Sequence, residues 1–336
     1  MNNLTIAIPT YNRNLILKAN LLTFLPYTPD NIKVLIIDNA SKIPVSDTLK
    51  DVLLSFPTID IKIIRNKENI FASANIVRCF LEANTKWVWV IGDEDTPLES
   101  SFKIFDKNKD NIETIFLGYS AENFCKIKFP AAGYGVDKFI SSIENLSALL
   151  FISTGIYNRD KIKSHIGFGY HYAYSQVPHL AILLSAMQPN DRWAFGAEQI
   201  VRRGDPVDAT QTFALYPIAR GLSTIVDIQN IFKSRHILKK KLSSLARDFL
   251  RPEIIAFEMI ALYYQKKENK PLEKYLSTFA TIPKDLASSW YVLKYLLCLA
   301  ILAFPDITIA LIRMFRGFNF AQRLSNKIKI DQSKRM

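Results

Sequence analysis

Short apolar runs and segments of helical period alternate through the first 95 residues. Runs of mainly aliphatic residues predict four strands, at 4–8, 31–38, 60–65 and 87–91. Between them, apolar positions recur at helical spacing and predict helices at about 15–25 and 70–83, with a shorter helix that ends near residue 55. Strands that alternate with helices indicate the α/β class, with a doubly wound, mostly parallel sheet whose ligands bind beyond the carboxyl ends of the strands.

Polar side chains follow each of these four strands. They comprise Thr10, Tyr11 and Arg13 after the first, Asp38 and Asn39 after the second, Arg65 and Asn66 after the third, and Asp93, Glu94 and Asp95 after the fourth. We expect them to meet at one edge of the sheet. No GxGxxG or GxxxxGK[ST] sequence occurs among them, so a bound diphosphate would be neutralised by a metal ion or by arginines instead of a glycine-rich cradle.

The acids at 93–95 are the strongest candidate for chemistry. If the fourth strand continues through them, Asp93 and Asp95 point to one side, roughly 6–7 Å apart, and Glu94 points to the other. Two such carboxylates suit Mg²⁺ or Mn²⁺ holding a diphosphate. The alternative is a solvated turn or a helix cap. The sequence from Thr96 to Glu99 resembles a capping box by itself, which leaves the acids free for another task.

The middle of the chain continues the mixed pattern. It predicts a helix at about 97–107, a strand near 113–117, a loop at 130–135, a helix at about 137–150 and an apolar segment at 151–157. From residue 213 the pattern becomes helical. Residues 234–251 form a basic amphipathic pattern, and an apolar stretch spans 286–304. Lys294 lies inside that stretch and Pro305 follows it, so a helix at a membrane interface is favoured over a membrane span.

The net charge of +12 is confined to the last third of the chain. Residues 1–232 carry 23 basic and 23 acidic side chains, whereas residues 233–336 carry 20 and 8. A basic excess in one region indicates a polyanionic partner, either nucleic acid or an anionic membrane surface. We favour the membrane, against the alternative of a helix that only packs on the rest of the protein. The tail 326–336 is expected to be disordered.

Cysteine usage and the amino-terminal sequence predict a location. Cys79, Cys125 and Cys298 stand singly and predict reduced thiols, neither a disulfide framework nor a zinc site. The first residues have neither the basic start nor the long apolar run of a signal peptide. We therefore expect a cytoplasmic protein, peripheral on the inner face of the cell membrane.

Four segments together resemble family 2 glycosyltransferases with the GT-A fold. They are Ile-Pro-Thr-Tyr-Asn-Arg at 8–13, Ile-Ile-Asp-Asn-Ala-Ser at 36–41, the segment 69–75, and Gly-Asp-Glu-Asp at 92–95. The resemblance covers roughly residues 1–230 and leaves 231–336 as a basic, apolar helical region. The family often has glycine where this chain has Ile70, and residues 167–179 are closer to an abequosyltransferase-like branch.

The resemblance also implies roles for particular residues. It places Pro9, Thr10, Arg13 and Asp38 around the nucleotide base, Asp93 near the ribose and Asp95 on the metal. The expected donor site further includes Tyr11, Asn39, Asn66, Glu94, Arg202 and Arg203. Asp38 would accept a hydrogen bond from a ring N–H, which favours UDP or dTDP while leaving CDP possible. The two arginines would close over the diphosphate, against the alternative of solvated surface side chains.

The general base is the least constrained residue. Many inverting members of the family carry a Glu-Asp pair near residue 177, where this chain has Gln176 and His179. Histidine has an ordinary pKa near 6.5 that suits proton abstraction, so we predict His179 as the base. The alternatives are a core or helix-capping role for His179, and Glu198 as the base. The stereochemical outcome and the oligomeric state stay open.

The resemblance implies a metal-dependent hexosyl- or deoxyhexosyltransferase. It would move a sugar from a nucleotide diphosphate sugar to a hydroxyl of a cell-surface glycan, on a free or lipid-linked acceptor, and would bind no nucleic acid. One alternative is a nucleotidyltransferase, which usually has a glycine-rich, lysine-containing loop after its first strand. Another is a non-enzymatic module that binds membranes or nucleic acid. The intact acids at 93–95 argue against the second alternative.

Overall fold

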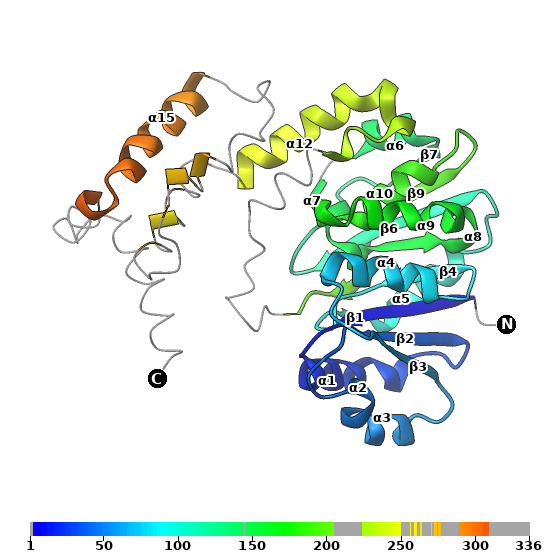
Figure 1. The fold of residues 1–336 in the computed structure, drawn as a ribbon. Helices are drawn as coiled ribbons and strands as arrows, with labels where there is room; N and C mark the ends of the chain where they lie inside the picture. The colour runs from blue at the N-terminus through cyan, green and yellow to red at the C-terminus, as the bar shows by residue number, and fades with distance from the viewer. Residues whose placement is uncertain are drawn as a thin grey trace. The chain divides into compact units, whose positions relative to one another are not determined.

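A computed structural model gives the structure of the protein (Figure 1). It describes residues 3–143, 146–204, 224–249 and 289–308, together with single positions between 256 and 276. The chain divides into two compact units. The first comprises Met1–Thr212 and Thr224–Lys239, and the second comprises Phe213–Ser223 and Lys240–Met336. The domain boundary at residue 230 stays a prediction.

A nine-stranded mixed sheet forms the centre of the first unit. Its order is β3-β2-β1-β4-β8-β6-β9-β5, with β7 paired to β9 off this path. The strands are β1 (Leu4–Thr10), β2 (Ile32–Asp38), β3 (Asp60–Arg65), β4 (Trp87–Val90), β5 (Thr96–Pro97), β6 (Thr114–Glu122), β7 (Ala131–Tyr134), β8 (Gly155–Asn158) and β9 (Arg192–Arg202).

The four strands predicted from the first 95 residues form the parallel half of this sheet. β1 lies between β2 and β4, and β2 pairs with β3, all in parallel. In this register Thr10 lies opposite Asp38, and Asp38 lies opposite Arg65. The other half is mixed, because β8 runs antiparallel to both β4 and β6 while β9 runs parallel to β6. The prediction of an α/β, mostly parallel sheet is confirmed.

Helices cover both faces of the sheet (Figure 1). In the first unit the α-helices are α1 (Asn14–Phe24), α2 (Val45–Thr48), α3 (Lys50–Ser55), α4 (Ala72–Glu82), α5 (Glu99–Asn108), α6 (Val136–Ser142), α7 (Leu146–Leu150), α8 (Arg159–Ile162), α9 (Ile166–His171) and α10 (Pro178–Ala186). Short 3₁₀ turns are η1 (Leu25–Tyr27), η2 (Ile152–Thr154), η3 (Lys163–His165), η4 (Ala173–Ser175) and η6 (Gln229–Ser234). Helix α12 (Arg235–Phe249) crosses the boundary between the units, and α15 (Ser289–Ala303) belongs to the second.

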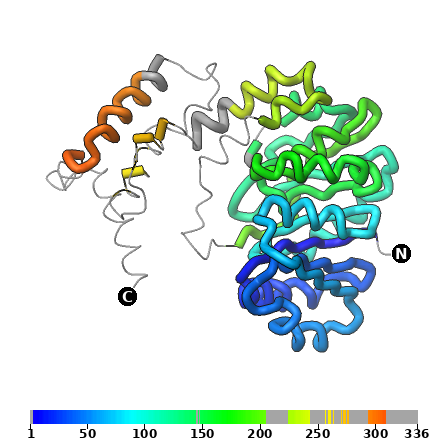
Figure 2. The backbone as a smooth tube through the Cα atoms, viewed as in Figure 1, coloured from blue at the N-terminus to red at the C-terminus, as the bar shows by residue number. Residues whose placement is uncertain are grey.

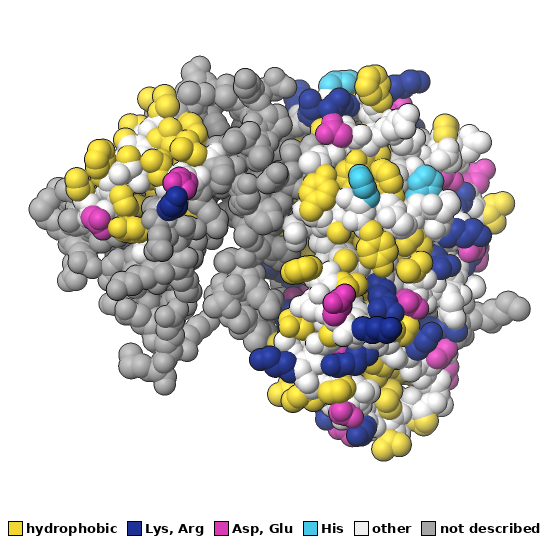
Figure 3. Space-filling model, viewed as in Figure 1, with side chains coloured by type: hydrophobic (Ala, Val, Ile, Leu, Met, Phe, Trp, Pro, Cys, Tyr) yellow, Lys and Arg dark blue, Asp and Glu magenta, His cyan; other side chains and the backbone are white. Residues whose placement is uncertain are grey.

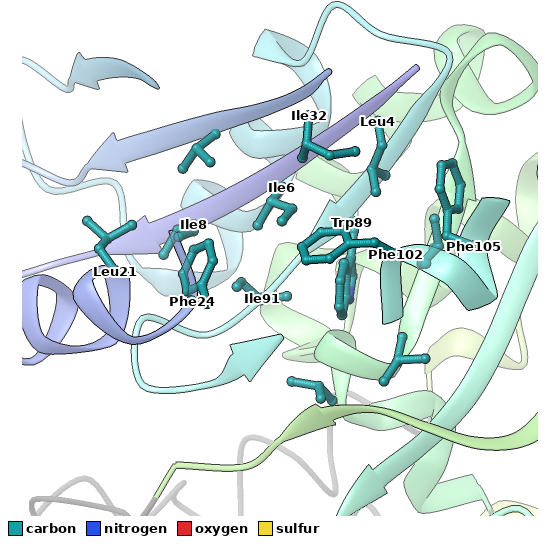
Figure 4. Packing of buried hydrophobic residues seen from close by; sticks show 14 of the residues in the cluster. Leu4, Ile6, Ile8, Leu21, Phe24, Ile32, Trp89, Ile91, Phe102 and Phe105 are labelled. Atoms are coloured by element: carbon teal, nitrogen blue, oxygen red, sulfur yellow. The ribbon is translucent and has the colours of Figure 1, made fainter. Parts of the chain in front are cut away.

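The main core lies between the sheet and helices α1 and α5. Alternate residues of β1 (Leu4, Ile6 and Ile8) pack there with Leu21 and Phe24 of α1 and with Phe102 and Phe105 of α5 (Figure 4). Helix α4 lies against β1 and β2, and α9 and α10, about 90 residues later in the chain, return to pack beside α4 (Figure 2). This packing fixes the strand ends from which the candidate site is built.

The structure corrects several local predictions. The predicted loop at 130–135 contains strand β7, and the predicted helix at 137–150 is two helices, α6 and α7, on either side of residues 144–145. Thr96 does not cap a helix, because Thr96 and Pro97 form strand β5 and the N-cap of α5 is Leu98, without a side-chain cap. The predicted tail at 326–336 lies outside the described residues.

Among the described residues, no helix combines the length and hydropathy that a membrane span requires. The predicted helices at 234–251 and 286–304 correspond to α12 and α15. Cys79, Cys125 and Cys298 form no disulfide, and all three are buried.

Candidate active site

The carboxyl ends of the parallel strands meet, as predicted, and their polar side chains contact one another. The Thr10 hydroxyl donates to Asp93 Oδ2 at 2.7 Å, and Arg65 Nη1 donates to Asp38 Oδ2 at 2.6 Å. The backbone links the two pairs, since the Asn39 amide donates to the Thr10 carbonyl at 2.9 Å. The first four strands therefore deliver one continuous polar cluster.

The acids at 93–95 do not continue strand β4, which ends at Val90. They lie instead in a tight turn, closed by a hydrogen bond from the Asp95 amide to the Gly92 carbonyl at 3.1 Å. The strand conformation expected for residues 93–95 is therefore wrong. The turn buries both carboxyl groups, leaving 4% of Asp93 and 3% of Asp95 exposed.

Asp93 is held from the side of β1. Its Oδ1 lies 3.1 Å from Arg13 Nη1, and the same guanidinium nitrogen lies 2.7 Å from Glu94 Oε2. Burial raises the pKa of Asp93 to about 8, with a further increase from Glu94 and an opposing decrease from Arg13. The buried charge is thus only partly compensated by Arg13.

Asp95 is held from the opposite side, by two segments distant in sequence. The Ser153 hydroxyl donates to Asp95 Oδ2 at 2.6 Å, and the Gly204 amide donates to Oδ1 at 3.1 Å. Ser153 Oγ also accepts a hydrogen bond from the Gly92 amide at 3.1 Å. Burial raises the pKa of Asp95, and the contacts with Ser153 and Gly204 oppose that shift.

Three residues of this pocket were missed by the sequence analysis. Asn20 of α1 donates to the carbonyls of both Asp93 (3.2 Å) and Asp95 (2.9 Å), and its own carbonyl accepts from the Thr96 hydroxyl at 2.7 Å. Asn20, Ser153 and Gly204 hold the turn through single polar atoms. In the sequence, Ser153 lies in the apolar segment 151–157, and Gly204 directly follows the predicted Arg202 and Arg203.

Gly204 is required for the close approach of two backbones. A Cβ built on Gly204 would lie 2.3 Å from the Glu94 carbonyl oxygen, a distance at which the backbone has to move. The segment that carries the two predicted arginines contacts the site through the backbone of Gly204. The arginine side chains have other partners. Arg202 pairs with Glu122 (2.5 Å), and the Arg203 guanidinium lies 4.2 Å from the ring centre of Phe124.

Asp38 is engaged by the chain's own groups and is only 1% exposed. Besides Arg65, its carboxylate accepts from the amides of Ser41 (2.8 Å) and Val45 (3.3 Å), and the Arg65 guanidinium also reaches the Ser41 carbonyl at 2.7 Å. Asp38 therefore organises the loop after β2, where Ala40 has a φ of 61°.

An asparagine cluster, consisting of Asn39, Asn66, Asn69 and Asn75, connects β2 and β3 to helix α4. Asn39 Oδ1 accepts from the Asn66 side chain (2.7 Å) and from the Ile70 amide (3.0 Å), while Asn39 Nδ2 donates to Asn69 (2.7 Å). Asn66 Nδ2 also donates to Asn75 at 3.0 Å. The two predicted donor-site amides, Asn39 and Asn66, thus belong to one network.

The loop held by this cluster contains an unusual backbone conformation. Phe71, next to Ile70, has a φ of 66° and a ψ of 161°, a region that favours glycine. Tyr11 after β1 and Phe71 are both exposed. The backbone conformation that favours glycine therefore occurs at Phe71. The neighbouring Ile70, at the position where the family often has glycine, is held through its backbone amide.

His179 lies outside this cluster. It is 2% exposed in helix α10, its Nε2 lies 2.9 Å from the Leu149 carbonyl, and its Nδ1 is buried without a hydrogen-bond partner among the described residues. Burial lowers the pKa of His179 to about 4. This placement argues against the predicted role as general base, because an enclosed imidazole cannot reach an acceptor hydroxyl. Glu198, the sequence alternative, is exposed on β9.

The donor set of the acid pocket fits a hard divalent cation. Thr10 and Arg13 each contact one oxygen of Asp93, and Ser153 and Gly204 each contact one oxygen of Asp95, whereas a carboxylate oxygen can accept two hydrogen bonds. Within the described residues, no three His, Cys, Asp or Glu side chains gather as a metal site. A cation would therefore take its remaining ligands from water and a bound diphosphate, as Mg²⁺ commonly does.

Comparisons with known proteins agree with this geometry. Residues 5–114 match the family described as glycosyl transferase family 2. The matched segment is about a third of the chain and contains β1 to β4 and the acids at 93–95. No curated protein sequence matches the chain.

Solved structures resemble most of the chain. S. aureus TarS 1–349 in complex with UDP-GlcNAc has a TM-score of 0.60 at 13% identity, covering 89% of this chain and 90% of that one. A mannosyltransferase from Pyrobaculum calidifontis, in complex with GDP-Man and Mn²⁺, has a TM-score of 0.50 at 11% identity, covering 89% and 86%. The protein has the GT-A fold of these glycosyltransferases, and its first 114 residues carry the family 2 match.

Proposed function

We propose that the protein is a metal-dependent glycosyltransferase that uses a nucleotide diphosphate sugar. The observation that carries this proposal is the buried pair Asp93 and Asp95, held at the carboxyl edge of β1 and β4 by five residues from four separate segments. Two carboxylates that are desolvated and incompletely compensated favour a cation. Their position beyond parallel strands is where ligands of doubly wound sheets bind.

Asp93 and Asp95 would hold Mn²⁺ or Mg²⁺ through the lone pairs that the chain leaves free. The ion would neutralise negative charge on the departing nucleotide diphosphate. Arg13, which now bridges Asp93 and Glu94, lies close enough to exchange a carboxylate for a phosphate oxygen. The two structural neighbours were solved with UDP-GlcNAc and with GDP-Man and Mn²⁺, which supports this assignment of donor class.

The nucleotide base would lie over the polar cluster of the first three strands. Pro9, Thr10 and Tyr11 border it from β1, and Asp38, Asn39 and Asn66 from β2 and β3. Because Asp38 is already bonded to Arg65, base recognition requires Arg65, whose side chain is 41% exposed, to move aside or to contact the base itself. UDP or dTDP is the favoured nucleotide, and a preference for CDP would support the abequosyltransferase-like branch.

The transferred group would be a hexosyl or deoxyhexosyl unit. The acceptor hydroxyl oxygen attacks the anomeric carbon, the bond from that carbon to the diphosphate oxygen breaks, and the hydroxyl proton is released. We propose a cell-surface glycan, free or lipid-linked, as the acceptor, and the inner face of the cell membrane as the location. The buried cysteines, none of them in a disulfide, support a reducing compartment.

A panel of radiolabelled nucleotide sugars tests the proposal. The full chain is incubated with each donor and Mn²⁺, with or without EDTA, and released nucleotide diphosphate is measured. We expect one donor to be hydrolysed or bound in a metal-dependent way. If no donor binds and nucleoside triphosphates are consumed instead, the nucleotidyltransferase alternative takes its place.

A further inference from the structure

Helix α15 presents an apolar stripe to the solvent. The stripe consists of Leu293, Leu296, Leu297 and Ile301 of α15 and of Phe304, which directly follows the helix; these side chains are 41–62% exposed. Their spacing of three, one, four and three residues places all five on one side of a helix. In Figure 3, hydrophobic side chains gather over this helix.

The opposite side of α15 already has a partner within the second unit. Cys298 and Leu302 are buried in a small core with Met259, Ile260 and Tyr275, and Tyr295 stacks on Tyr275 with ring centres 5.5 Å apart. The orientation of α15 is therefore set by its own core. The apolar stripe faces outward as a consequence, and turning it inward would expose Cys298 and Leu302.

Charge complementarity identifies the occupant of this surface. Residues 233–336 contain 20 basic and 8 acidic side chains, so the region that displays the stripe also carries the whole excess of positive charge. A self-associating surface on so basic a region would bring like charges together. An anionic lipid surface instead satisfies the positive charge and accepts apolar side chains.

We propose that the α15 stripe inserts into an anionic lipid monolayer and holds the protein at a membrane surface. Insertion buries the five side chains among acyl chains, while basic residues of the same region contact lipid headgroups. Binding by this mode has one component that resists salt, from apolar burial, and one that weakens with salt. The inference is independent of the proposed activity, because binding is measured without donor or acceptor.

Flotation of the full chain with vesicles tests the proposal. Vesicles of phosphatidylcholine alone are compared with vesicles containing 30% phosphatidylglycerol, at low and high salt. Leu296→Gln/Leu297→Gln/Ile301→Gln removes the centre of the stripe. Leu54→Gln/Ile112→Gln is the matched control, since both residues are exposed apolar side chains of the first unit.

We expect partitioning of the stripe variant to anionic vesicles to fall about tenfold or more, because each inserted aliphatic side chain stabilises the bound state by burying apolar surface. The control variant should bind as the unchanged protein does. Thermal melting confirms that both variants fold. Equal binding by the stripe variant overturns the proposal. So does a light-scattering mass above one chain that returns to one chain only in the stripe variant, because the stripe would then be a contact between two copies.

Discussion

The side chain of Ser153 connects the turn at residues 92–95 to a part of the chain that is distant in sequence. Its hydroxyl is fully buried, donates to Asp95 and accepts from the Gly92 amide, so it closes the turn from both ends. Ser153→Ala removes these two hydrogen bonds and adds no new side-chain atoms. The substitution therefore isolates the polar contribution of one oxygen atom.

The expected cost follows from the chemistry of the two partners. A hydrogen bond to a carboxylate contributes about 1.5–3 kcal/mol, and a buried amide left unpaired costs about 1–3 kcal/mol. Both effects come from one hydroxyl and partly overlap, so we expect the free energy of unfolding to fall by about 2–4 kcal/mol. The pKa of Asp95 should also rise further, because its charged form loses a donor.

Ser101→Ala is the matched control. Ser101 is equally buried, yet its hydroxyl has no hydrogen-bond partner among the described residues, so its removal should change stability by less than about 0.5 kcal/mol. Urea unfolding followed by tryptophan fluorescence measures both variants, since Trp87, Trp89 and Trp193 are buried in the first unit. Mn²⁺ binding by calorimetry then reports on the turn itself.

Equal stability of the two alanine variants would refute the reasoning. It would mean that Ser153 does not bond a charged Asp95. A destabilised Ser153→Ala protein with unchanged Mn²⁺ affinity would refute the narrower claim that the turn orients the metal ligands.

Further predictions concern the acids and His179. Asp95→Ala, or treatment with EDTA, should lower turnover at least about 10²-fold, and full activity in either case would contradict the metal assignment. Because the pKa of Asp93 is raised, its protonated form is favoured in the folded protein, so Mn²⁺ affinity should increase with pH up to about 8 and Asp93→Asn should flatten that increase. Without metal, the contribution of Asp93 to stability is fully present below its unfolded pKa near 4 and is lost as pH rises from there through about 8. Asp38→Ala should weaken UDP binding more than it lowers kcat, and it should also lower the melting temperature because Arg65 loses its partner. If the wild-type protein binds CDP as tightly as UDP, Asp38 does not select the nucleotide base. His179→Ala should lower the melting temperature with little loss of kcat per folded molecule, whereas a loss of kcat without a loss of stability would restore it as the base.

The local pattern of apolar and polar residues was sufficient to predict the strands in the amino-terminal half of the sheet. The strand that ends at Asp38 is observed as β2, and the apolar run at 87–91 as β4 (Trp87–Val90). Period and composition are properties of neighbouring residues, and parallel pairing then brings the strand ends to one edge. For this reason the cluster of Thr10, Asp38 and Asp93 could be anticipated from the sequence.

The geometry of the acids could not be anticipated in the same way. An apolar run followed by Gly92 and three acids is compatible with a strand or a turn. The turn forms because Asn20, Ser153 and Gly204 supply donors that lie 58 to 109 residues from Asp95. Similarly, Thr96 has the sequence environment of a helix cap but pairs with β9 and bonds Asn20.

The burial of particular side chains is the property that the tertiary structure decided and the sequence alone did not determine. The sequence alone determined the order of the first four strands and the helices between them, the identity of the acids and the location of the positive charge, because these depend on residue type and spacing. Tertiary packing decided that His179 is enclosed, that Asp38 is committed to Arg65 and that the α15 stripe faces outward. Each of these depends on which distant residue displaces water from a side chain, and spacing along the chain does not contain that information.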